Sequence, residues 1–145
     1  MPGTLYLIPN TLGPTDATSG ALNALHPTQV QALTATLDYF VAENAKTARA
    51  FLKLIALDHP LAKPLQEIEI AELNVNTPAQ ALAQLLAPLL AGRDAGLVSE
   101  AGVPAVADPG ADLVRLAHQH GIAVRPLVGP SSLLLAVMAS GLNGQ

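Results

Sequence analysis

Short apolar runs alternate with segments of helical periodicity along almost the whole chain, and this alternation limits the folds that it can adopt. Strands are predicted over residues 5–9, 39–43, 68–73, 95–99 and 122–128. Between them, apolar residues recur at helical spacing in segments that begin near residues 27, 44, 77 and 108. Strands that alternate with helices form parallel sheets with right-handed crossovers. The sequence therefore predicts an α/β domain with a mostly parallel sheet of about five strands and helices on both faces.

Local signals indicate where several helices begin and end. Asn44 is a favourable N-cap for a helix whose apolar stripe comprises Ala48, Phe51, Leu52 and Ile55. Thr77-Pro78 and Asp108-Pro109 each combine a capping residue with a proline suited to the first helical position. Glycines are expected to end the two helices that follow, at Gly92 and Gly121.

Charge and cysteine content exclude several kinds of site. Seven Lys plus Arg stand against eleven Asp plus Glu, and the basic residues are scattered between Lys46 and Arg125 without a run. The sequence alone therefore predicts no basic face for nucleic acid. There is no cysteine, and the four histidines lack metal-ligand spacing, so we expect neither disulfides nor a metal site. No signal peptide or membrane span is apparent, and a cytoplasmic protein is expected.

Three loops follow predicted strands at the edge where open parallel sheets bind ligands. They cover residues 9–18, 100–110 and 129–132. The second belongs to the most informative stretch, SEAGVPAVADPG, whose small residues leave backbone amides open to a ligand. Neither a G-x-G-x-x-G nor a G-x-x-x-x-G-K-[ST] motif occurs, so dinucleotide and nucleoside-triphosphate binding lack their usual support.

The same stretch carries a family resemblance. Residues 99–104 and 107–110 resemble the S-D-A-G-x-P and S-D-P-G signature of the ribosomal RNA small-subunit methyltransferase I branch of the tetrapyrrole methylases. Residues 127–132 (LVGPSS) are similar to the P-G-P-S-A element of that family, and residues 40–44 (FVAEN) to its second strand. The resemblance covers nearly the whole chain.

The resemblance implies an S-adenosylmethionine-dependent methyltransferase with two α/β domains and the methyl donor bound between them. Residues 1–129 would form the N-terminal domain, and residues 130–145 a linker helix into a missing C-terminal domain, so that this fragment alone is expected to be inactive. The acceptor would be ribosomal RNA or a tetrapyrrole-like small molecule. The implied donor contacts fall on Pro9, Ala101, Gly102, Val103, Val106, Ser131 and Ser132.

Two questions stay open at this stage. Glu100 directly follows a predicted strand and is a candidate catalytic residue, because a carboxylate there could take a proton or face a cationic donor. Substitutions relative to the family pattern, at Glu100, Val103 and Val128, support an alternative: a non-catalytic ligand-binding or dimerisation module on the same fold. Self-association as a homodimer is expected through an apolar segment that includes Leu133, Leu134, Val137 and Met138.

Overall fold

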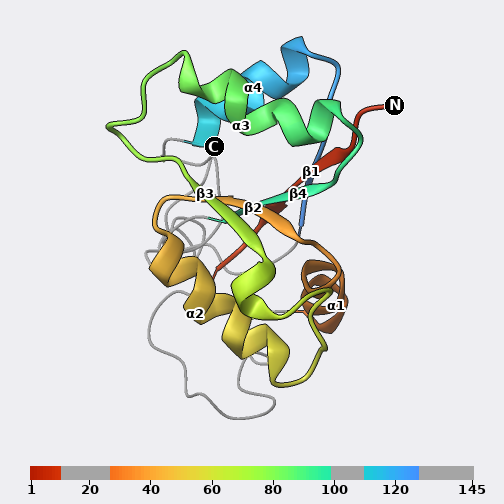
Figure 1. Cartoon of the computed structure of the whole chain (residues 1–145). Coiled ribbons are helices and arrows are strands. Elements are labelled where there is room, and N and C mark those ends of the chain that lie inside the picture. The colour runs from red at the N-terminus through yellow and green to blue at the C-terminus, as the bar shows by residue number, and fades with distance from the viewer. Residues whose placement is uncertain (11–26, 99–109, 128–145) are drawn as a thin grey trace, which may run out of the picture.

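The computed structural model describes residues 1–10, 27–98 and 110–127, and these form a parallel five-stranded sheet between two layers of helices (Figure 1). The strands lie in the order β3-β2-β4-β1-β5. Their bounds are β1 Thr4–Ile8, β2 Tyr39–Ala42, β3 Glu69–Glu72, β4 Ala95–Val98 and β5 Ala123–Pro126. The predicted fold class is confirmed, because every strand pair is parallel and the strands alternate with helices.

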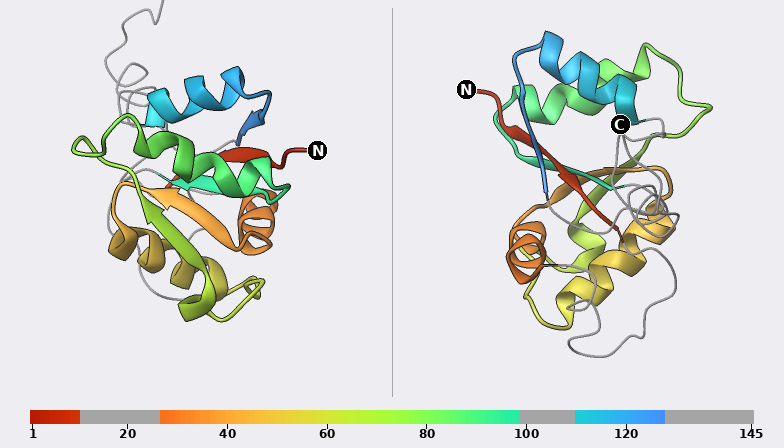
Figure 2. Two further views of the ribbon diagram at one scale, coloured as in Figure 1. Left: turned by 45° about the horizontal axis from the view of Figure 1, so that its top comes forward. Right: turned by 180° about the vertical axis from the view of Figure 1, so that it is seen from behind.

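Each face of the sheet has its own pair of helices, which Figure 2 shows from two further directions. Helices α1 (Thr28–Ala35) and α2 (Ala45–Ala56) cover one face, and α3 (Ala81–Leu90) and α4 (Gly110–Gln119) cover the other. Alternate strand residues enter opposite cores, so Phe40 packs toward α2 while Tyr39 and Val41 pack toward α3. The three central strands are therefore almost wholly buried, as expected for a parallel sheet.

The predicted start of α2 is confirmed. The Asn44 side chain accepts hydrogen bonds from the backbone N–H groups of Lys46, at 2.8 Å, and Thr47, at 3.2 Å. The expected apolar stripe is the buried face of this helix. Its spacing matched one face of a helix, and the cap residue satisfied amides that would otherwise lack partners.

The predicted start of α3 at Thr77-Pro78 is wrong. The helix begins at Ala81, and its N-cap residue is Gln80, which makes no side-chain capping bond. Thr77 instead closes a turn, since its hydroxyl oxygen accepts from the Asn74 N–H at 3.0 Å. The end of α3 is as predicted, because Gly92 follows it with a φ of 100°, in the region that favours glycine.

The two edge strands are more exposed than the central ones. The prediction that residues 68–73 lie near a sheet edge is confirmed, since β3 pairs with β2 alone and both of its glutamates are exposed. At the other edge, β5 is shorter than predicted, although the Leu127 N–H still donates to the Leu7 carbonyl at 3.0 Å. No helix within the described residues is long and apolar enough to cross a membrane.

Candidate functional site

The carboxyl ends of the three central strands lie level with one another. Ile8 of β1 pairs with Val98 of β4, and Val98 in turn pairs with Ala42 of β2. The residues that follow β1 and β2 are Pro9 and Glu43, so both enter the same edge of the sheet. We call this edge the carboxyl edge.

The chain leaves neighbouring strands in opposite directions at the carboxyl edge. Strands β1 and β2 lead to α1 and α2 on one face, whereas β4, which lies between them, leads to α4 on the other. Such a reversal opens a crevice beyond the strand ends, and ligands of open α/β sheets bind in crevices of this kind. The carboxyl end of β4 is therefore the position that the fold itself favours for a ligand.

Of the predicted site residues, the structure describes Pro9. It is buried directly after β1, and the next residue, Asn10, is also buried, with 3% of its surface exposed. Gly110, the first residue of α4, is buried as well. Gly110 directly follows residues 99–109, the segment that contains most of the predicted contacts. The other predicted donor contacts and the candidate Glu100 lie outside the described residues, as do Asp108-Pro109 and the predicted linker helix.

The first turn of α2 is already bonded within the chain. Besides the Asn44 cap, the Oε2 atom of Glu72, at the end of β3, accepts from the Ala45 N–H at 2.9 Å. A negative group at a helix N-terminus also interacts favourably with the helix dipole. This contact was not predicted from the sequence, because its partners are 27 residues apart. The α2 N-terminus is therefore held by the fold, and α4 is the helix whose start adjoins the candidate site.

Charged side chains gather at the opposite, amino-terminal edge of the sheet. Asp38 lies 2.9 Å from the Lys63 ammonium and 3.2 Å from the Arg93 guanidinium, which also lies 3.3 Å from Glu69. The Arg93 group also lies 5.3 Å from the centre of the Tyr39 ring. We call these residues the amino-edge network. It connects the loops before β2, β3 and β4, which is a structural role.

The pKa values of Tyr39 and Asp38 are among those shifted within the amino-edge network. Burial, with a smaller effect of the Glu69 charge, raises the pKa of Tyr39 to about 12, and its hydroxyl donates to the Leu85 carbonyl at 2.7 Å. The hydrogen bond from Lys63, with further help from Arg93, lowers the pKa of Asp38. Shifted pKa values often indicate catalytic sites, but these two belong to groups far from the strand ends where ligands bind.

An Asp38→Asn variant is expected to be less stable than the wild type at pH 7, by about 0.5 to 1 kcal/mol, because the paired side chains are partly exposed. The pKa of Asp38 is lower in the folded state, so its contribution is present above the unfolded-state pKa. This contribution to stability is lost as the pH falls through the lowered, folded-state pKa of Asp38. Urea unfolding should show a smaller difference between the two proteins at pH 2.5 than at pH 7. An equal difference at both pH values would contradict this.

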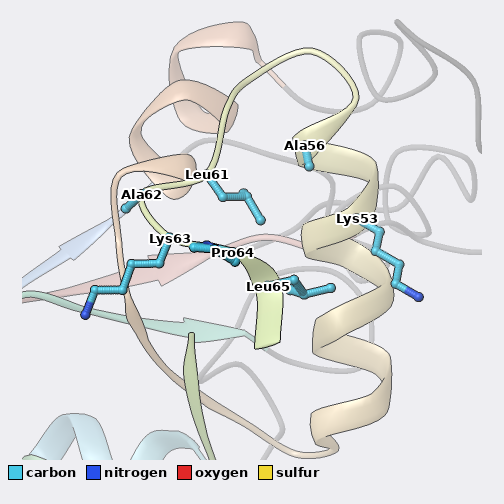
Figure 3. A pocket seen from close by; sticks show the side chains of 7 residues that line it. All are labelled: Lys53, Ala56, Leu61, Ala62, Lys63, Pro64 and Leu65. Atoms are coloured by element: carbon cyan, nitrogen blue, oxygen red, sulfur yellow. The ribbon is translucent and has the colours of Figure 1, made fainter. Parts of the chain in front are cut away.

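A surface cavity of about 440 Å³ lies beside the C-terminal half of α2 (Figure 3). Its lining is Lys53, Ala56, Leu61, Ala62, Lys63, Pro64 and Leu65. The two lysine side chains point away from each other, and Lys63 binds Asp38. The cavity therefore has no converging polar groups and lies away from the carboxyl edge. The described residues also contain no cluster of side chains suited to a metal ion.

The chain is similar in sequence to ribosomal RNA small subunit methyltransferase I proteins from several bacteria. The ribosomal RNA small subunit methyltransferase I of Xylella fastidiosa is 33% identical over 141 residues, which cover 97% of this chain and 45% of that protein. The protein of the same name from Streptococcus pyogenes serotype M1 is 33% identical over 144 residues, covering 99% and 44%. The resemblance to ribosomal RNA methyltransferase I is confirmed. The chain spans less than half the length of these relatives, and no protein-family model matches it.

A solved structure supports the fold in particular. The uroporphyrin-III-C-methyltransferase of Thermus thermophilus superposes with a TM-score of 0.56 and 23% identity, over 99% of this chain and 55% of that one. At this identity the similarity is one of fold. The comparison therefore supports the α/β fold described above.

Proposed function

We propose that this chain is the donor-binding part of an S-adenosylmethionine-dependent methyltransferase that acts on ribosomal RNA. The observation that carries the proposal is the position of β4: the strand reverses the direction of the chain at the carboxyl edge, and the family-like segment SEAGVPAVADPG begins directly after it. The similarity to ribosomal RNA methyltransferases over 97% of the chain favours an RNA acceptor over a tetrapyrrole.

The described residues fit the proposed donor. Those that directly follow strands at the carboxyl edge are Pro9, Glu43, Leu73 and Leu127, and none of them is basic. A neutral to acidic edge suits a cationic sulfonium, and the missing phosphate-binding motifs are not needed, because the donor carries no phosphate. By resemblance, backbone groups of Ala101, Gly102, Val103 and Val106, with Pro9, Ser131 and Ser132, would hold the adenosine and methionine portions.

The chain contributes positioning to the reaction. S-adenosylmethionine would supply the methyl group, which is attached to its sulfonium sulfur. After the methyl group is transferred, the rest of the donor leaves as a neutral thioether. Backbone groups fixed at the end of a central strand can align such a donor with a nucleophile, and alignment alone can supply much of the acceleration. Glu100 is the proposed proton acceptor, because it is the acid nearest in sequence to the end of β4.

Further parts of the proposal concern the whole protein. Residues 1–129 would form the donor-binding domain, and residues 130–145 a helix that links it to a second domain; the greater length of the relatives supports this division. The apolar residues of that helix support a homodimer. A ribosomal RNA acceptor and the absence of cysteine support a cytoplasmic location.

Calorimetric titration with S-adenosylhomocysteine tests the proposal. The chain should be compared with a longer protein that extends to the length of its relatives. We expect the longer protein to bind S-adenosylhomocysteine and, when supplied with S-adenosylmethionine, to transfer methyl groups to small-subunit ribosomal RNA. Donor binding without transfer to any RNA would favour the non-catalytic module, and no binding by the longer protein would contradict a methyltransferase.

A further inference from the structure

Helix α2 brings together basic residues that the sequence shows as scattered. Lys46, Arg49 and Lys53 recur at intervals of three and four residues, which places them on one side of the helix. All three are exposed, and α2 contains no acidic residue. These three residues, which we call the α2 basic stripe, are three of the seven basic residues in a chain of net charge −4.

The packing of α2 turns the stripe toward solvent. The opposite side of the helix, formed by Ala48, Phe51, Leu52 and Ile55, is buried against the sheet. The first turn lies at the carboxyl edge, because α2 begins three residues after the end of β2. Helix α2 therefore starts at the carboxyl edge and runs away from it (Figure 1), and the stripe follows its exposed side.

Most other basic residues already have acidic partners. Lys63 and Arg93 belong to the amino-edge network, and Arg115 lies 2.7 Å from Asp112 on the same helix. Within residues 1–10, 27–98 and 110–127, no member of the stripe forms an ion pair. Its three charges are therefore available to a polyanion.

We propose that the α2 basic stripe binds the phosphodiester backbone of the RNA acceptor. From Lys46 to Lys53 the helix rises about 10 Å, so the three positive charges form a line that can contact successive phosphates of one strand. Backbone contacts of this kind fix the position of the RNA without reading its sequence. The stripe would hold RNA beside the carboxyl edge while other groups select the methylated nucleotide. This inference rests on the proposed function for the identity of the polyanion.

The test is the salt dependence of RNA binding by this chain and by the triple variant Lys46→Gln, Arg49→Gln, Lys53→Gln. Glutamine keeps the helix propensity and much of the side-chain length. Fluorescence anisotropy with a labelled hairpin from small-subunit ribosomal RNA gives the affinity at several salt concentrations. Three lost phosphate contacts should weaken binding at low salt about tenfold or more, and reduce the slope of log K against log salt by about 2 to 3.

A matched variant controls for net charge. This control combines three substitutions on α3 and α4, across the sheet from the stripe: Gln84→Glu, Ala87→Glu and Arg115→Gln. Together they change the net charge from −4 to −7, as the stripe variant does. The inference requires that this control retain the wild-type salt slope. The inference would be overturned if both variants lost RNA affinity equally or if the stripe variant lost none. It would also be overturned if the wild-type chain did not bind RNA. Thermal unfolding should give similar midpoints for all three proteins.

Donor binding separates this inference from the proposed function. S-adenosylhomocysteine titrations of the longer protein, with and without the stripe substitutions, should give the same affinity, because the stripe lies outside the proposed donor contacts. If the longer protein does not bind the donor product but RNA binding still depends on the stripe, the proposed methyltransferase function is contradicted and the RNA-binding surface is supported. If the longer protein binds the donor product normally but RNA binding does not depend on the stripe, the methyltransferase function is supported and the RNA-binding surface is contradicted.

Discussion

A Gly96→Val variant is expected to lose about 3 kcal/mol of unfolding free energy, because residue 96 has no room for a side chain. A Cβ atom at this position would lie 2.5 Å from the Ile8 Cδ1 atom and 2.8 Å from the Phe40 Cδ1 atom. Gly96 is in the middle of β4, which is bonded to β1 on one side and β2 on the other, so the backbone cannot move away. Urea unfolding, followed by circular dichroism, measures the loss.

A double-mutant cycle distinguishes this clash from a general effect of glycine replacement. Ile8→Val removes the Cδ1 atom nearest to residue 96 and alone should lower stability by about 1 kcal/mol. In a Gly96→Ala background the same change should be neutral or stabilising, because it removes the atom that clashes. Strictly additive effects of Ile8→Val and Gly96→Ala would contradict the steric explanation.

The elements that sequence predicted well are those with local causes. The boundaries of α2 followed from one cap residue and one apolar stripe, both of which act within a few residues. The edge position of β3 followed from its alternation of apolar and acidic residues. In each case, neighbouring residues carried the information.

Of the features that sequence missed, one is a local turn and one is a contact between distant segments. Thr77-Pro78 had the pattern of a helix start, but a hydrogen bond to Asn74 uses the Thr77 hydroxyl in a turn. Glu72 looked like one acid of an edge strand, whereas its carboxylate bonds the first turn of α2.

The place of the candidate site could be predicted in part from the sequence. A parallel sheet implies ligand binding beyond the carboxyl ends, and the strand order adds that β4, between β1 and β2, is the point of reversal. Strand order depends on pairing between segments far apart in the chain, so the sequence alone did not give it. Pro9 occupies the expected edge, whereas Gly102 remains a prediction from resemblance and Glu100 a prediction from its place after a strand.

Replacing Gly102 with leucine is expected to weaken S-adenosylhomocysteine binding by at least about a hundredfold, or about 2.8 kcal/mol, in the longer protein. On the proposed function, Gly102 is a backbone contact of the donor, four residues beyond the end of β4. A glycine at such a position lets the ligand approach the main chain closely, and an isobutyl group would occupy that space. Calorimetric titration measures the loss.

The control for Gly102→Leu is Ala83→Leu, which adds a similar side chain to the exposed surface of α3. Ala83→Leu should bind the donor product as the wild type does, and both variants should unfold at similar urea concentrations. A Gly102→Ala variant should show an intermediate affinity, because a single methyl group fills less of the space. Wild-type affinity in Gly102→Leu would remove residues 101–103 from the donor site, and the crevice beyond β4 would then need another occupant.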